Sequence, residues 1–186
     1  GKNQLASGFF VYGPQTTLIL TIGNGVAAFI LNENEFIRMD WEPKLSQTGN
    51  QFAINMSNMR FWSQKAQDYI KKCQDGAEGS FAKNYNMRWC GSLVADAWRI
   101  FREGGIFLYP EDSRKNYDSG RLRLIYEANP IALLVEQAGG RASNGETEIL
   151  KIKPSAIHQR VPLIFGSKED VINYCLLYTS PSPRDA

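Results

Sequence analysis

The first quarter of the chain contains short apolar runs that are separated by turn residues. The two breaks between three successive runs read Gly-Asn-Gly and Asn-Glu-Asn. Turn residues at this spacing are typical of β-hairpins, so we expect an antiparallel meander with strands at 16–22, 26–31 and 35–41. Three strands alone are only marginally stable, and we therefore expect further structure upstream of residue 1 in the parent protein.

From residue 50 onward the pattern changes to helices that alternate with short strands. Leu93, Ala97 and Phe101 recur at helical spacing before Gly104, which predicts a buried helix over 89–103. The same reasoning predicts a polar helix at 65–73, a strand at 106–109, extended stretches at 149–152 and 162–166, and a helix that starts at Ser167. This order is that of an α/β protein without internal repeats.

The segment 120–130, with the sequence GRLRLIYEANP, carries the most informative polar pattern. If it is extended, its side chains alternate between two faces. One face then holds Arg121, Arg123, Ile125 and Glu127, and the other holds Leu122, Leu124 and Tyr126. The charged row would span roughly 20 Å at about 3.3 Å per residue, too far for Arg123 and Glu127 to neutralise each other directly. Either a ligand with phosphate and metal bridges them, or the arginines are solvated at a strand edge.

The residues that follow predict a helix. Asn129 and Pro130 suit the N-cap and the first helical position, and the pair Gly139-Gly140 would end the helix. Glu127 would then lie where a strand ends and a helix begins, a usual place for ligands in open α/β sheets.

At the other end of the chain, residues 175–186 run into two Ser-Pro pairs. These cannot continue a helix, so we expect a disordered or foreign tail.

Composition excludes several classes of function. The chain has 186 residues, 43% of them hydrophobic and 22% charged, which suffices for one or two domains with a packed core. The net charge of +2 gives no general basic field for nucleic acid or a membrane surface, so any anion must be bound locally. Three widely spaced cysteines argue against a disulfide framework and favour a reducing cytoplasm. No apolar run approaches 18 residues, so we expect a soluble protein.

Arg88 and Tyr109 are candidate phosphate ligands. Arg88 precedes Gly91 and Ser92 at the expected start of a helix, where free N–H groups and the helix dipole attract anions. The simpler interpretation is that Gly91 and Ser92 only cap the helix. Tyr109 ends a strand, where its hydroxyl could donate to phosphate, although a strand tyrosine more often packs in the core.

Other polar and aromatic positions are less informative. Asn55 follows an apolar run, a position at which asparagine usually forms a turn. His158 is the only histidine, which excludes a multi-histidine metal site and favours a solvated or structurally bonded ring. The aromatic residues Phe61, Trp62, Trp89 and Trp98 have no accompanying basic stripe, so core packing is favoured over base stacking.

Five blocks of the sequence resemble the C-terminal portion of class I fructose-1,6-bisphosphatases, most like the bacterial enzymes. They are GFFVYGPQTTLIL, FAINMSNMRFW, NMRWCGSLVADAWRIFREGGIFLYP, GRLRLIYEANPIALLVEQAGG and IHQRVPLIFGS, all in the family's order between residues 8 and 174. The resemblance implies a layered sugar-phosphatase α/β fold, with a C-terminal mixed-sheet domain at 50–174 and antiparallel strands of the N-terminal domain at 1–49. It also implies a homotetramer that uses Mg²⁺ to hydrolyse the 1-phosphate of fructose 1,6-bisphosphate, giving fructose 6-phosphate and phosphate.

The resemblance assigns several residues to the 6-phosphate of the sugar. Asn55 and Tyr109 match residues that hold this phosphate, and Arg88 matches an arginine that family members supply from a neighbouring subunit. Arg121 stands where many members have lysine, which replaces a point donor by a planar fork. Asn58 and Trp89 stand where many members have tyrosine, so two hydroxyl groups for the 6-phosphate are missing.

The remaining matches concern the sugar ring and the reacting phosphate. Gly91, Ser92 and Leu93 match the segment along the ring, with leucine where some members have methionine. Arg123 matches the arginine near the 1-phosphate, and Glu127 matches a magnesium ligand. The family's other metal ligands, an acidic loop of the type DPLDGS and an earlier glutamate pair, do not occur in this sequence.

One carboxylate cannot assemble a magnesium cluster, so we expect this chain to be an inactive fragment of the enzyme. Two alternatives remain open. The complete protein would act on both fructose and sedoheptulose bisphosphates, consistent with the changes at Asn58 and Trp89. Otherwise the chain is a non-catalytic sugar-phosphate-binding module that uses Arg88, Arg121 and Arg123 without metal.

Overall fold

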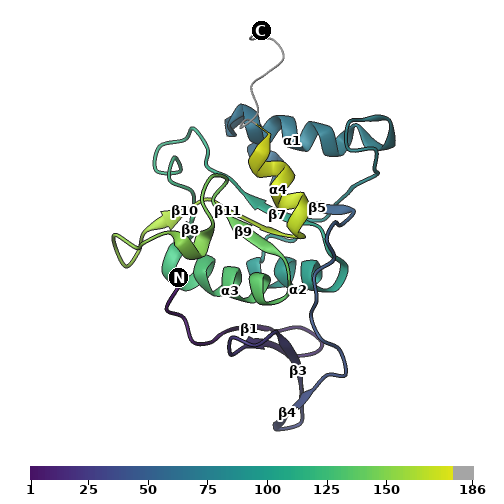
Figure 1. Ribbon diagram of the computed structural model, residues 1–186, viewed down its shortest axis with the longest axis vertical. Helices are drawn as coiled ribbons and strands as arrows, with labels where there is room; N and C mark the ends of the chain where they lie inside the picture. The colour runs from purple at the N-terminus through teal and green to yellow at the C-terminus, as the bar shows by residue number, and fades with distance from the viewer. Residues whose placement is uncertain (178–186) are drawn as a thin grey trace.

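The computed structural model describes residues 1–177, which form two main sheets and four α-helices (Figure 1). An antiparallel sheet has the order β1-β2-β3-β4. Its strands are β1 (Ser7–Val11), β2 (Thr17–Thr21), β3 (Ala27–Asn32) and β4 (Glu35–Arg38). The predicted meander is thus confirmed, and it has a fourth strand, β1, which pairs with β2 and places Ser7 opposite Thr21.

A mixed sheet of five strands has the order β6-β5-β7-β11-β9. Its strands are β5 (Gln51–Ala53), β6 (Asn86–Met87), β7 (Ile106–Tyr109), β9 (Arg141–Ser143) and β11 (Leu163–Gly166). β5 runs parallel to β6 and β7, whereas β11 runs antiparallel to β7 and β9. A separate pair, β8 (Leu122–Arg123) and β10 (Arg160–Val161), lies beside this sheet (Figure 1).

The helices divide the sheets into layers (Figure 1). They are α1 (Gln64–Gln74), α2 (Leu93–Glu103), α3 (Asn129–Gln137) and α4 (Lys168–Leu176). One core joins the antiparallel sheet to α2, α3 and the near face of the mixed sheet, through Phe9, Phe101 and Phe107. A second core covers the far face with α1 and α4, through Leu108, Tyr69 and Tyr174. The predicted layered α/β architecture is therefore confirmed.

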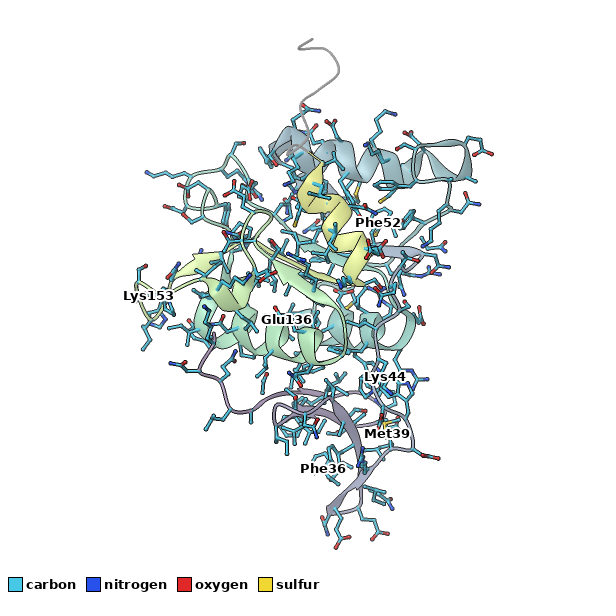
Figure 2. The ribbon with its side chains drawn as sticks, viewed as in Figure 1. Phe36, Met39, Lys44, Phe52, Glu136 and Lys153 are labelled. Atoms are coloured by element: carbon cyan, nitrogen blue, oxygen red, sulfur yellow. The ribbon has the colours of Figure 1, made fainter. Side chains whose placement is uncertain are left out.

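The outer face of the antiparallel sheet is rich in exposed aromatic residues. Phe10 stacks on Tyr12 with ring centroids 6.0 Å apart and lies 5.8 Å from Phe36. Figure 2 shows Phe36 at the end of the molecule remote from α1. Within residues 1–177, no helix combines the length and apolar character that crossing a bilayer requires.

Three element boundaries differ from the sequence predictions. The helix expected from residue 89 begins at Leu93, because Gly91 has φ = 81° and Ser92 is still extended. The stretch expected to be extended at 149–152 is a 3-10 turn, Ile149–Lys151, in which the Lys151 N–H donates to the Glu148 carbonyl. α4 continues through Leu176, and the carbonyl of Cys175 accepts a 2.9 Å hydrogen bond from Lys65 Nζ. Residues 178–186 of the expected tail lie outside the described residues.

Asp170 links the helical layer to the loop before β5. Its carboxylate accepts 2.7 Å and 3.5 Å hydrogen bonds from the Gly49 N–H and the Tyr85 hydroxyl. The side chain is buried, and burial raises the pKa of Asp170 above its usual value. Because the folded state then binds the proton more tightly than the unfolded state, the free energy of unfolding falls as the pH rises above about 3.9, the unfolded pKa.

We predict that Asp170→Asn removes this part of the pH dependence while it keeps an oxygen for the Gly49 N–H. The difference in unfolding free energy between variant and wild type should shift in favour of the variant from about pH 4 upward. Urea denaturation at a series of pH values measures it. Parallel profiles for the two proteins would contradict the pKa shift.

Candidate active site

The site begins at a close backbone contact between two chain segments. Gly120 has φ = +80°, and a Cβ on this residue would lie 2.2 Å from the Pro162 nitrogen and the Val161 carbonyl carbon. Only glycine combines this conformation with this approach. This contact lies at the start of the antiparallel pair of β8 and β10. In that pair Arg123 of β8 is opposite Arg160 of β10.

The predicted extended row of charges from Arg121 to Glu127 is wrong. β8 ends at Arg123, and Leu124–Ala128 form a π-helical turn in which the Asn129 N–H donates to the Leu124 carbonyl. Glu127 therefore turns back toward the strand. Its Oε2 accepts a 2.6 Å hydrogen bond from the Arg123 N–H and lies 3.9 Å from the Arg123 guanidinium.

The physical reason is burial at the start of α3. Leu124 and Ala128 lie in the core, whereas Ile125 and Tyr126 between them are exposed, a pattern that fits a helical turn and not a strand. Helical backbone thus begins at Leu124, and Asn129 is already helical and does not form the N-cap. The predicted end of the helix is confirmed, since Gly139 has φ = +86° and the Gly140 N–H donates to the Val135 carbonyl.

Asn55 and Tyr109 line a common hollow with Asn58 and Asp112. Asn55 caps the 3-10 turn Met56–Phe61, because its Oδ1 accepts a 3.2 Å hydrogen bond from the Ser57 N–H. The predicted turn role of Asn55 is confirmed. Its amide nitrogen is the atom with which it would donate to an anion.

Arg121 lies beside Tyr109, the last residue of β7. Its guanidinium carbon is 4.4 Å from the centre of the Tyr117 ring and 5.8 Å from that of Tyr109. These are distances at which a cation is attracted to an aromatic face. Arg121 and Tyr109 therefore present a cation and a phenol beside the hollow that contains Asn55.

An ion pair fixes the loop between Tyr109 and Arg121. The Arg114 guanidinium and N–H donate to the Asp112 carboxylate, with Nε and N each 3.0 Å from Oδ1. This hydrogen bonding, together with the field of Arg121, lowers the pKa of Asp112 below its usual value. Arg114 also lies over the Tyr117 ring, so the ion pair supports the ring on which Arg121 rests.

Trp89 brings the next segment to Tyr109. Its ring centroid lies 6.0 Å from that of Tyr109 and 5.7 Å from that of Phe107, on which it stacks. After Cys90, the chain continues through Gly91, Ser92 and Leu93. Gly91 and Ser92 are exposed, and Ser92 is the N-cap of α2 but makes no side-chain capping bond.

Arg88 is held by its backbone only. Its N–H donates to the Phe52 carbonyl, and its carbonyl accepts a 2.9 Å hydrogen bond from Arg99, which also pairs with buried Asp96. Within residues 1–177, the exposed side chain of Arg88 forms no hydrogen bond or ion pair with the other candidate residues. The structure thus brings Asn55, Tyr109 and Arg121 together, pairs Arg123 with Glu127, and leaves Arg88 separate.

Sequence reasoning missed Tyr117 and the pair Asp112–Arg114. They belong to an irregular loop with no periodic pattern, and only the two-residue spacing of opposite charges at 112 and 114 could have indicated a local ion pair. A solvated or structurally bonded histidine was predicted, and the ring of His158 is both exposed and bonded, with Nδ1 2.9 Å from the Tyr126 hydroxyl.

A magnesium ion does not fit the residues of this chain by themselves. Within residues 1–177, no group of three histidine, cysteine, aspartate or glutamate residues is arranged to hold a metal ion. Glu127 is a single carboxylate, already hydrogen-bonded by the Arg123 N–H. Magnesium is usually held by several oxygen ligands in near-octahedral geometry.

Comparison with known proteins decides the family. Residues 45–179 match the model of the fructose-1,6-bisphosphatase C-terminal domain. The chain belongs to the fructose-1,6-bisphosphatase family. This match covers every candidate residue from Asn55 to Glu127 and confirms the resemblance found in the five sequence blocks.

Individual relatives agree. The chain is 50% identical over 180 residues to the class 1 fructose-1,6-bisphosphatase of Azorhizobium caulinodans, covering 96% of the chain and 55% of that protein. It is 52% identical over 184 residues to one from Nitrobacter hamburgensis, covering 98% of the chain and 53% of the relative. A crystal structure of Leishmania major fructose-1,6-bisphosphatase in holo form matches with a TM-score of 0.87 and 36% identity, covering 95% of this chain and 53% of that one. The chain thus spans about half the length of these relatives.

We predict that Gly120→Ala destabilises the chain far more than Gly139→Ala. Both glycines have positive φ, so each substitution costs about 1–2 kcal/mol of backbone strain. A Cβ at Gly139 meets nothing within 4 Å, whereas one at Gly120 overlaps the Val161–Pro162 backbone and separates β8 from β10. Urea denaturation of the two variants should show a loss several times larger for Gly120→Ala, and equal losses would contradict the close contact.

Proposed function

We propose that the complete protein is a fructose-1,6-bisphosphatase that hydrolyses the 1-phosphate of fructose 1,6-bisphosphate to give fructose 6-phosphate and phosphate. The observation that carries the proposal is the adjacency of Arg123 and Glu127 next to Arg121 in a chain of this family. A guanidinium can stabilise charge on a phosphoryl group, and a carboxylate 3.9 Å from it can help to hold a metal ion, two parts that recur in phosphoryl-transfer sites.

The proposed 6-phosphate subsite is the region around Tyr109. Arg121 supplies a fork of N–H donors, and Tyr109 and Asn55 add a hydroxyl and an amide from neighbouring elements. Gly91, Ser92 and Leu93 follow Trp89 along this region and provide the surface for the sugar ring. The space next to Gly91 is open for the sugar ring, since a Cβ on this residue would meet only the Trp89 indole nitrogen, at 3.7 Å.

Arg123 is proposed to bind the reacting 1-phosphate. Its side chain is 40% exposed, so its guanidinium is accessible to a ligand, and its backbone is fixed by Glu127. Phosphoryl transfer spreads negative charge over the phosphoryl oxygens, and a preorganised guanidinium stabilises that charge. Arg123 would thereby favour the transition state over the bound substrate.

Glu127 is the proposed Mg²⁺ ligand that this part of the protein contributes. Since one carboxylate does not make a magnesium site, the activity is proposed for the whole protein and not for residues 1–186 alone. In that protein, 1–49 would belong to an N-terminal domain and 50–174 to the sugar-phosphate-binding domain. We further propose a cytoplasmic homotetramer in which the exposed Arg88 reaches the subsite of a neighbouring subunit.

A broader substrate range is the second candidate function. Asn58 lines the hollow with Asn55 and Tyr109, and the Trp89 ring is packed on Phe107, so neither supplies a phenol hydroxyl at the 6-phosphate. Fewer fixed donors discriminate less between bisphosphates of different length. Comparing kcat/KM for fructose 1,6-bisphosphate and sedoheptulose 1,7-bisphosphate with the complete protein separates the two candidates.

We predict that a version extended to the full length of the relatives releases phosphate from fructose 1,6-bisphosphate only with Mg²⁺, and that Glu127→Gln reduces kcat by at least about a hundredfold. The 186-residue chain should be inactive in the same assay. Magnesium-dependent turnover by the short chain would overturn the fragment assignment. An inactive extended protein that still binds fructose 6-phosphate would favour the non-catalytic module.

We also predict that Arg121→Ala weakens fructose 6-phosphate binding by about tenfold or more, the usual effect of losing a charge-assisted hydrogen bond. Arg38→Ala is the matched control, because Arg38 is an exposed arginine on β4 of the other sheet. Isothermal titration with the extended protein measures both. Equal affinities for the two variants would remove Arg121 from the subsite.

A further inference from the structure

Arg160 lies directly opposite Arg123 in the β8–β10 pair. The Leu124 N–H donates a 2.8 Å hydrogen bond to the Gln159 carbonyl, so a ladder bond joins the two residues next to the Arg123–Arg160 pair. Pair types alternate along such a ladder, so Arg123 and Arg160 form a non-hydrogen-bonded pair, the type in which side chains approach most closely. This agrees with the Arg123 N–H, which points away from β10 and donates to Glu127.

Arg123 and Arg160 lie on the same face of the pair. The adjacent residues Leu122 and Val161 are also opposite each other and face the core, which leaves the two arginines on the outer face. Cβ atoms of directly opposed residues are about 4.5–5.5 Å apart, and like charges at this separation destabilise a sheet. The strand register therefore places two like charges opposite each other beside the proposed reaction centre.

No acid in the described part of the chain forms an ion pair with Arg160. Within residues 1–177 it forms no ion pair, and Glu127 lies 3.9 Å from Arg123, so the three groups together keep a charge of +1. Arg160 is exposed and lines a surface hollow with residues 115–119. The acid in that hollow, Asp118, lies beyond ion-pair distance of Arg160, and Lys115 adds a further positive charge. The loop that carries Lys153 extends from the side of the molecule on which β10 lies, at the left of the view (Figures 1 and 2).

We propose that Arg160 is a second phosphate-binding arginine of the reaction centre, which shares with Arg123 the phosphoryl group that is transferred. The proposal rests on the proposed function, because that function places the 1-phosphate at Arg123. A dianionic phosphate has three oxygens for two guanidinium forks, so it removes the repulsion between the arginines and satisfies both. In the free protein the same repulsion keeps the two side chains apart and the site open.

The proposal predicts opposite effects of one substitution on the free and the phosphate-bound chain. In low-salt buffer without phosphate, Arg160→Ala should leave the Tm unchanged or raise it, because a like-charge contact is lost. In inorganic phosphate the wild-type chain should be stabilised relative to sodium chloride of equal ionic strength, and Arg160→Ala should lose this stabilisation. A merely structural arginine would lower the Tm equally in both buffers.

The controls are Arg38→Ala, which removes an arginine from the other sheet, and Arg160→Lys, which keeps the charge without the fork. Arg38→Ala should retain the full phosphate effect, and Arg160→Lys part of it. Equal stabilisation of wild type and Arg160→Ala by phosphate would overturn the proposal, as would a wild-type chain that phosphate does not stabilise.

Kinetics of the extended protein separate this proposal from the function on which it rests. Arg160→Ala should lower kcat/KM for fructose 1,6-bisphosphate by about tenfold or more, as expected for one lost charge-assisted hydrogen bond, with affinity for fructose 6-phosphate unchanged. If the extended wild type is inactive, the proposed function fails while the phosphate experiment still judges Arg160. If it is active and Arg160→Ala has full activity, only the role of Arg160 fails.

Discussion

Burial of α3 between the two sheets determines where the charged residues of the site lie. The helix contacts β1 of the antiparallel sheet and β9 of the mixed sheet, and Ile131, Leu134 and Val135 on it are almost fully buried. The apolar positions Leu124 and Ala128 extend this buried face backward, so helical backbone starts as soon as β8 leaves β10. That early start turns Glu127 toward Arg123. The proposed chemistry at the end of β8 thus follows from hydrophobic packing several residues away, as is usual for sites supported by a rigid scaffold.

Much of the fold was predictable because its periodic signals are local. The end of α3 just before Gly139, the strand before Pro110 and the helix after Ser167 all come from residue types with strong positional preferences. The segment after Gly120 could not be predicted in the same way. Leu122 and Leu124 alternate with arginines as in a strand, while Leu124, Ala128 and Ile131 also have helical spacing. Tertiary burial of Leu124 decides between the two patterns, and a single sequence does not contain that information.

The candidate site divides in the same manner. Residues with a proposed role near a strand end, such as Tyr109 and Arg121, were predicted from their positions and from the family resemblance. The residues that position Tyr109 and Arg121 were not predicted, because their contacts are made across an irregular loop. Tyr117 supports Arg121 by its ring, and Arg114 joins Asp112 to that ring. Pairing of Arg123 with Arg160 depends on strand register, which is fixed by the contact of Gly120 with the Val161–Pro162 peptide.

The π-helical turn Leu124–Ala128 makes the length of this segment as important as its composition. A π-turn contains one residue more than an α-turn between the same hydrogen-bonded ends, so it accommodates an insertion without changing the direction of the helix that follows. Removal of Ile125 or Tyr126 would restore α-helical spacing between Leu124 and Asn129 and change the angle at which Glu127 leaves the turn relative to Arg123. Every hydrophobic contact of α3 could then persist while the carboxylate pointed elsewhere. During divergence of such proteins, tolerance to substitution at the exposed positions Ile125 and Tyr126 would therefore coexist with intolerance to deletion.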